Sequence, residues 1–196
     1  MERKSTEVRK NEIIHAAWGL MREDGAQNVT IKKISQEIAT SEAAIYRHFK
    51  DKHSILMALV DSFEENLMEA IDKPMRNYKS PIDQLREIMK THMVFTEKKQ
   101  GLLFAITAES IHFGDDELRR RILEVIEKYK KRIKQILQEA KKAELLDVNI
   151  NLDAVSLTFF GLIDAAIVQY ALTNYTVPPI KRFDTLWRIF YRGIKR

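Results

Sequence analysis

Residues 30–52 constrain the fold more than any other stretch, because two short helical patterns occur there with a break between them. In the first half, isoleucines recur at intervals of three and four residues, which is typical of one face of an α-helix: Ile31, Ile34 and Ile38. After the break, Ile45 and Phe49 predict the buried face of a second helix. A helix of about eight residues is only marginally stable alone in water, so both segments must pack against neighbours.

The residues around these patterns predict how the pair begins and what it presents. Thr30 and Ser41 stand at the expected N-caps, where a hydroxyl oxygen can accept a free backbone N–H. The second helix turns small, aromatic and basic residues away from its buried face: Ala43, Ala44, Tyr46 and Arg47. Two short helices joined by a tight turn, with such a face on the second, are typical of a DNA-reading helix-turn-helix.

The segment IYRHFKDKHSIL resembles the DNA-binding region of the TetR/AcrR family of transcriptional regulators. The hallmark of that family, aromatic-x-x-F-x-x-K, is present here as Tyr46, Phe49 and Lys52, and the resemblance extends to about residue 60. It implies that the second helix enters the major groove. It also implies base or phosphate contacts from Thr30, Lys32, Ser41, Glu42, Ala43, Ala44, Tyr46, His48 and Lys52. Arg47 is a further candidate, since it points outward from the same helix.

Two positions depart from the family pattern. Ala39 occupies the turn position where the family usually has glycine, and Ala44 replaces a hydroxyl residue. A left-handed backbone costs a non-glycine residue about 1 kcal/mol, so the turn needs either another conformation or some strain. Ala44 removes one phosphate donor.

Composition extends the helical prediction to the whole chain. Among 196 residues there are only six glycines and four prolines, which favours an all-α protein. Repeating apolar patterns predict helices over residues 6–23, 30–38, 41–49, 52–72, 81–98, 102–113, 116–145, 152–173 and 183–194. The segment 102–113 is apolar on nearly every side, so we expect it to be buried. Pro74, Asn77, Ser80 and Pro81 predict a break in the chain.

Two domains follow from this organisation: a helix-turn-helix domain over residues 1–52, and a helical effector-binding and dimerisation domain over residues 53–196. The net charge of +5 is compatible with double-stranded DNA as a partner. Residues 1–52 contribute little of it, with ten basic and eight acidic side chains. Without cysteine, an apolar leader or a long apolar run, we expect a cytoplasmic protein with no membrane contact.

Signatures of enzymes are not found in the sequence. The five histidines do not form a helical metal motif with carboxylates, and no glycine-rich phosphate loop or G-x-S-x-G turn occurs. We therefore expect neither catalysis nor a cofactor or metal.

An effector site is predicted in the second domain, for a small, largely apolar ligand. The candidate lining residues lie on the inward faces of the predicted helices: His92, Phe95, Phe104, Thr107, Ser110, Phe113 and Phe159. His92 and the hydroxyl residues would orient the ligand. The competing interpretation is that His92 is a hydrogen-bonded core residue and that the phenylalanines only pack.

The last two predicted helices are candidates for a dimer interface, because the segment 152–173 is too apolar for one buried face. The residues expected there are Phe160, Gly161, Ala165, Trp187 and Phe190. The resulting prediction is a homodimeric repressor that an effector releases from a palindromic operator. Two alternatives remain open: a helical ligand-binding or enzymatic protein with a degenerate head, and an architectural DNA-binding protein without an effector.

Overall fold

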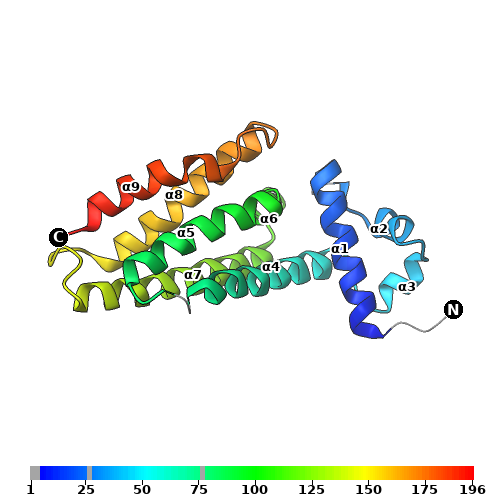
Figure 1. Ribbon diagram of the computed structural model, residues 1–196. Helices are drawn as coiled ribbons and strands as arrows, with labels where there is room; N and C mark the ends of the chain where they lie inside the picture. The colour runs from blue at the N-terminus through cyan, green and yellow to red at the C-terminus, as the bar shows by residue number, and fades with distance from the viewer. Residues whose placement is uncertain (1–4, 26–27, 76–77) are drawn as a thin grey trace. The chain divides into compact units, whose positions relative to one another are not determined.

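The computed structural model describes residues 5–25, 28–75 and 78–196, and over these residues it confirms the all-α prediction (Figure 1). The described part of the chain contains nine α-helices and a 3-10 turn, η2. In order they are α1 (Thr6–Asp24), α2 (Ile31–Glu37), α3 (Glu42–Tyr46), α4 (Lys52–Met75), α5 (Pro81–Lys98), α6 (Leu102–His112), α7 (Asp116–Lys142), α8 (Leu152–Leu172), η2 (Pro179–Arg182) and α9 (Phe183–Ile194). Asn77, expected in the break after α4, lies outside the described residues.

Local capping explains most helix ends. Ser5 caps α1 by accepting the N–H of Val8, and Gly25, at φ 82°, ends that helix by donating to the carbonyl of Met21. Asn151 caps α8 in the same way. Pro81 occupies the first turn of α5, whereas the side chain of Ser80, at the N-cap position, makes no capping bond. These bonds join residues close in sequence, so the sequence predicts them well.

Four expectations need correction. α4 continues through Pro74 to Met75, so the proline lies within the helix and not in the break. α3 spans five residues, because the chain turns after Tyr46, and α7 ends at Lys142. α6 buries only the stripe Leu102, Ile106 and Ser110. Ile111 of α6 is exposed, and so is Phe113, which follows the end of the helix. This segment is therefore apolar but not enclosed.

The chain divides into two compact units. Unit 1 comprises the residues up to Glu64 together with Leu102–Ile122. In it, α1 packs against α2 and α6, and α2 packs against α3, around a core that includes Ile13, Ile34 and Ile45. The predicted boundary after Lys52 remains a prediction about which residues suffice to bind DNA.

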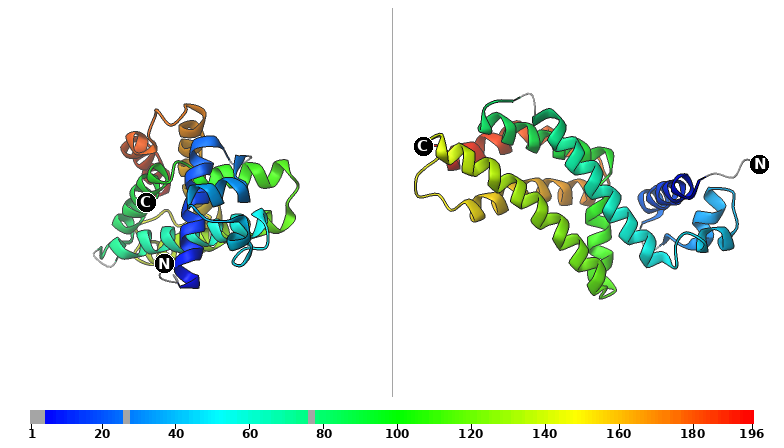
Figure 2. Two further views of the ribbon diagram at one scale, coloured as in Figure 1. Left: turned by 90° about the vertical axis from the view of Figure 1, so that its right-hand side faces the viewer. Right: turned by 90° about the horizontal axis from the view of Figure 1, so that it is seen from below.

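Unit 2 comprises Glu65–Gly101 and Leu123–Arg196. Here α5, η2, α8 and α9 pack against one another, and α5, α8 and α9 run side by side in Figures 1 and 2. Phe159 of α8 and Phe190 of α9 form an edge-to-face pair at 5.1 Å between ring centroids. This aromatic pair joins the last two helices within one subunit.

By length and composition, α8 could cross a membrane. This corrects the expectation that no segment reaches that length, although core helices of water-soluble proteins meet the same description. Seven of its residues are buried against its own unit, among them Val155, Ile163 and Ile167. Packing within unit 2 therefore accounts for part of its apolar character, and other apolar side chains of α8, such as Leu157 and Leu172, remain exposed.

Candidate nucleic-acid interface

The α2–α3 pair has the geometry of a helix-turn-helix, built by two hydroxyl caps and one left-handed residue. Thr30 Oγ1 accepts the N–H of Lys33 at 3.2 Å, and Ser41 Oγ accepts the N–H of Ala44 at 3.2 Å. Between the helices, Ala39 has φ 48°, so the turn takes the left-handed conformation despite having no glycine there. Of the two possibilities that the sequence left open, the turn takes the strained one, at a cost of about 1 kcal/mol.

α3 presents one face outward, because Ile45 is its only buried residue. Glu42, Ala43, Tyr46 and Arg47 are exposed, and Tyr46 exposes 53% of its surface. Within the described residues, this face is turned to solvent. It is the surface that a helix of this kind inserts into a DNA groove.

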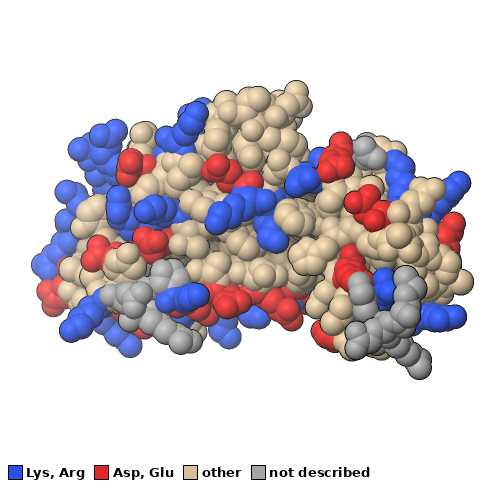
Figure 3. Space-filling view, turned by 45° about the vertical axis from the view of Figure 1, so that its right-hand side comes forward, with Lys and Arg blue, Asp and Glu red and all other residues tan. Residues whose placement is uncertain are grey.

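The other predicted contacts flank this face. Ser41 and Lys32 are exposed, Ala44 and His48 are half-buried, and the exposed Thr30 uses its hydroxyl as a helix cap. A capping hydroxyl oxygen accepts from the backbone and can still donate its proton to a phosphate. On the face of the molecule drawn in Figure 3, Lys and Arg side chains are interspersed with Asp and Glu.

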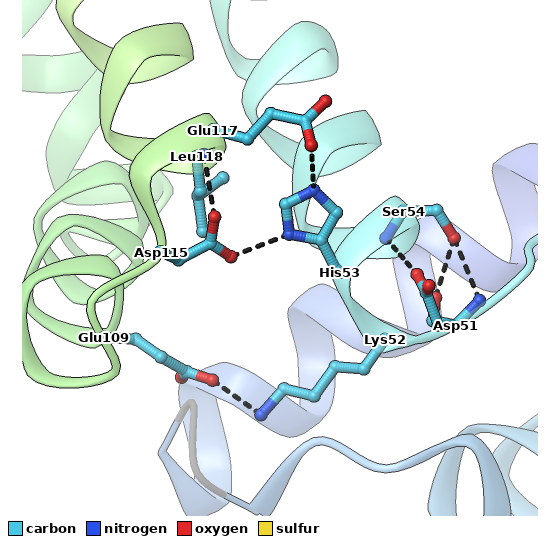
Figure 4. Close-up of polar contacts among 8 residues, drawn as sticks. All are labelled: Asp51, Lys52, His53, Ser54, Glu109, Asp115, Glu117 and Leu118. Carbon is cyan, nitrogen blue, oxygen red and sulfur yellow. Dashed lines mark hydrogen bonds and ion pairs between the residues drawn. The ribbon is translucent and has the colours of Figure 1, made fainter.

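Lys52, expected to contact phosphate, forms an ion pair within unit 1. Its Nζ lies 2.6 Å from Glu109 Oε1 on α6 (Figure 4). The Glu109 side chain is only 8% exposed, whereas that of Lys52 is 31% exposed. A DNA phosphate that binds Lys52 would therefore have to share the lysine with the Glu109 carboxylate or displace that carboxylate.

Two reciprocal hydrogen bonds between Asp51 and Ser54 cap the first turn of α4. Asp51 Oδ1 accepts the N–H of Ser54 at 2.8 Å, and Ser54 Oγ accepts the N–H of Asp51 at 3.2 Å. The backbone bond from Ser54 lowers the pKa of Asp51. This reciprocal bonding resembles a capping box and holds Lys52 and His53 at a fixed position on the helix.

His53 connects this turn to the corner between α6 and α7. Its Nδ1 lies 2.7 Å from Asp115 Oδ2, and its Nε2 lies 3.3 Å from Glu117 Oε2 (Figure 4). Burial acts to lower the pKa of His53, but the hydrogen bond to Asp115 and the charges of Asp115, Glu117 and Asp51 raise it above its usual value. For Asp115, burial acts to raise the pKa, but the backbone bond from Leu118 and the contact with His53 lower it. Both shifts favour a charged pair near neutral pH.

Glu109, Asp115 and Glu117 were missed as site residues by sequence reasoning. Asp115 stands just before α7, and its Oδ1 caps that helix by accepting the N–H of Leu118 at 3.0 Å. The sequence carries no signal for contacts between segments so far apart in the chain.

Four of the predicted effector-site residues lie on or beside α6 in unit 1. The hydroxyls of Thr107 and Ser110 donate to carbonyls of their own helix, those of Leu103 and Thr107. Phe104 is half-buried, and Phe113 is 65% exposed. Ser110 and Phe113 border a cleft of about 280 Å³ whose walls combine apolar side chains with the charged groups of Lys52, Glu109 and Asp115.

The other three predicted effector-site residues belong to unit 2. His92 and Phe159 are buried, and Phe95 is half-buried with Lys99 Nζ 6.0 Å from its ring centroid. His92 meets the ring of Tyr129 edge-on, with centroids 4.9 Å apart. Phe159 packs on Phe190, as the competing core interpretation expects.

The predicted dimer residues divide into two groups. Trp187 and Phe190 are buried within the subunit, so they are core residues of unit 2 and are not presented to a partner. Gly161 and Ala165 are exposed and Phe160 is half-buried. A Cβ added at Gly161 would meet nothing within 4 Å.

An exposed stripe of small and apolar side chains follows one side of α8. Its members are Leu157, Gly161, Ala165 and Leu172, of which Leu157 and Leu172 are 56% and 78% exposed. On α9, Ile189 is also exposed. Sequence periodicity could have found this stripe only if the buried side of α8 had been known.

A capped helix-turn-helix with an outward-facing second helix, attached to a separate helical unit, defines a DNA-binding regulator. The family models agree with this class. Residues 13–59 match the model described as "Bacterial regulatory proteins, tetR family". Residues 79–195, more than half of the chain, match the "Tetracyclin repressor-like, C-terminal domain". The chain therefore belongs to the TetR family of DNA-binding regulators.

Similar proteins include the nucleoid occlusion factor SlmA of Vibrio atlanticus, which is 28% identical over 188 residues, covering 95% of this chain and 96% of that protein. Among solved structures, the fatty acid degradation regulator FadR from Bacillus halodurans shares the fold with a TM-score of 0.85 and 18% identity, with 98% of each chain covered. FadR from Bacillus subtilis, solved in complex with stearoyl-CoA, has a TM-score of 0.81 and 19% identity, covering 94% of this chain and 98% of that one.

Proposed function

We propose that the protein is a cytoplasmic homodimeric repressor that binds a palindromic operator and is released by a small, largely apolar effector. The observation that carries the proposal is the outward face of α3 and its C-cap, which exposes Tyr46 and Arg47 to solvent. A head with one short reading helix contacts few base pairs. Two heads related by a two-fold axis would read two half-sites, which makes the operator a palindrome.

The exposed stripe on α8 supports the dimer. Leu157 and Leu172 lie on the same side of the helix as Gly161 and Ala165, which have small side chains or none. Such a row lets two helices approach closely and buries apolar surface that a monomer would leave in water. Two α8–α9 pairs would then form a four-helix interface.

Effector release is supported by the fold and by a relative. Unit 2 is a separate helical unit, and the structure of the similar FadR from Bacillus subtilis contains stearoyl-CoA. For an effector to release DNA, it must bind more tightly to a conformation in which the two heads no longer match the half-sites. The release rests on that difference in affinity and not on ligand binding as such.

A second function is favoured by the relatives named nucleoid occlusion factor. In this alternative the protein acts while bound to DNA, without an effector that releases it. The two functions differ in their response to small molecules and in where on the chromosome the protein binds.

Selection of bound duplexes from a random pool tests both. For a repressor with a palindromic operator, we expect an inverted repeat to be enriched by the wild-type protein and to be lost with Tyr46→Ala. Lys142→Ala, a charge change on the exposed surface of α7, is the matched control. A compound library is then screened for release of the selected duplex. An enriched sequence without symmetry would refute the palindrome, and a selected site that no ligand releases would favour the alternative.

A further inference from the structure

Three buried polar side chains come together in the core of unit 2. His92 and Thr96 lie one turn apart on α5 and therefore on the same side of the helix. Tyr129 of α7 faces His92, with the two rings edge-on at 4.9 Å between centroids. None of the three residues is more than 4% exposed.

Each of these side chains has a polar atom that the described protein atoms leave without a hydrogen-bond partner. The atoms are His92 Nδ1, Thr96 Oγ1 and Tyr129 OH. Buried polar atoms in native proteins are almost always hydrogen-bonded, because an unmet bond destabilises the fold. Three such atoms on neighbouring residues of one core are therefore a reason to look for a hydrogen-bonding partner from outside the chain.

Packing alone does not explain these residue types. The neighbouring buried positions on α5 are fully apolar, Leu85, Ile88, Met89 and Met93. Valine has the shape of threonine, and phenylalanine that of tyrosine, and neither would leave a polar atom unmet. Threonine and tyrosine in place of valine and phenylalanine cost stability in this core, which indicates that the polar groups serve a function.

The electrical state of the cluster limits what it can bind. Burial lowers the pKa of His92 to about 4 and raises that of Tyr129 well above its usual value. At neutral pH all three side chains are therefore uncharged and offer both donors and acceptors. An ionised group buried here would meet no opposite charge from these three residues, which is costly.

We propose that His92, Thr96 and Tyr129 bind an uncharged hydroxyl, carbonyl or amide group of an otherwise apolar ligand, and that they discriminate against a carboxylate in its place. The inference rests on the proposed function for the idea that unit 2 receives an effector. It adds which side chains recognise the polar group and which chemistry they select.

The test measures binding directly, without DNA. Isothermal titration of the full-length protein compares two neutral compounds, 2-naphthol and decan-1-ol, with their charged counterparts, 2-naphthoate and decanoate, at pH 7.5. We expect each neutral compound to bind about tenfold or more tightly than its carboxylate, as a site with hydrogen-bonding groups discriminates strongly. If neither neutral compound binds, or if the carboxylates bind equally well, the proposal is wrong.

Near-isosteric variants assign the preference to the cluster. Thr96→Val and Tyr129→Phe should each weaken binding of the neutral compounds severalfold and, because they remove an unmet polar atom, raise the melting temperature of the free protein. Tyr170→Phe, which changes another buried tyrosine of unit 2, is the control and should keep the preference. If the two variants melt higher but bind the neutral compounds as well as wild type, the cluster is only structural and the proposal falls.

Operator binding with and without 2-naphthol or decan-1-ol separates this inference from the proposed function. A neutral compound that binds with the expected preference but leaves operator affinity unchanged would support the site and refute these compounds as effectors. If another compound releases the operator from the Thr96→Val and Tyr129→Phe variants as well as from wild type, the repressor proposal is supported and the proposed ligand site is refuted.

Discussion

The ion pair between Lys52 and Glu109 predicts that removing a carboxylate will strengthen DNA binding. Lys52 Nζ lies 2.6 Å from Glu109 Oε1, and a phosphate that needs Lys52 must compete with that carboxylate. Ion pairs at protein surfaces contribute about 0.2–1 kcal/mol. Glu109 is nearly buried, which places this pair at about 1 kcal/mol, the upper end of that range.

Glu109→Gln keeps the shape of the side chain and removes its charge. If binding breaks one such pair in each head, the substitution should raise operator affinity about fivefold for one head and about 30-fold for a dimer. Lys52→Ala should lower affinity and reduce the dependence on salt by about one phosphate contact per head.

Fluorescence anisotropy of a labelled operator duplex at fixed salt measures both substitutions singly and together. In the Lys52→Ala background, the gain from Glu109→Gln should largely disappear, because the lysine that it releases is absent. Asp116→Asn, which removes a charge from an exposed residue of the same unit, is the control for general repulsion of DNA. A gain that persists undiminished without Lys52, or weaker binding by Glu109→Gln alone, would refute the competition.

Three further predictions follow from the described contacts. Ala39→Gly should raise the free energy of unfolding by about 0.5–1 kcal/mol, since it relieves the left-handed alanine at φ 48° at a smaller entropic cost, and urea denaturation checks the sign. Leu157→Glu should give folded monomers with weak operator binding because Leu157 is exposed, whereas Trp187→Glu should unfold the buried core; sedimentation with circular dichroism distinguishes them, and a Leu157→Glu dimer would contradict the interface. Because the pKa of His53 is raised on folding, charged His53 stabilises the fold fully below its unfolded pKa near 6.5, and this stabilisation is lost as the pH rises through its folded pKa. The difference in melting temperature between wild type and His53→Gln should therefore shrink from pH 6 to pH 9. A constant difference would show that the ring only packs.

Much of the reading head could be predicted from the sequence, because its signals are local. Thr30 and Ser41 cap the two helices as expected, since a cap joins residues three positions apart. Ile45 is buried and Tyr46 is exposed because helical spacing fixes which neighbours share a face. At Ala39 the sequence left another conformation or some strain open, and the left-handed φ of 48° shows that the turn is strained.

Other features depended on which segments meet. Trp187 fits an interface by composition but is buried in its own subunit, because the other helices of unit 2 cover that side of α9. α6 is apolar on nearly all sides, yet only the stripe facing its neighbours is enclosed. Composition cannot show which of several apolar faces finds a partner.

The sequence by itself determined the helix-turn-helix and the all-α fold, because caps, turns and helical periodicity act between residues a few positions apart, and the resemblance of residues 45–56 to a known family indicated the family. Only the tertiary structure decided that Lys52 pairs with Glu109 and that His92 faces Tyr129. Each of these contacts joins two helices well separated along the chain. Their formation depends on how helices pack, which no local pattern specifies.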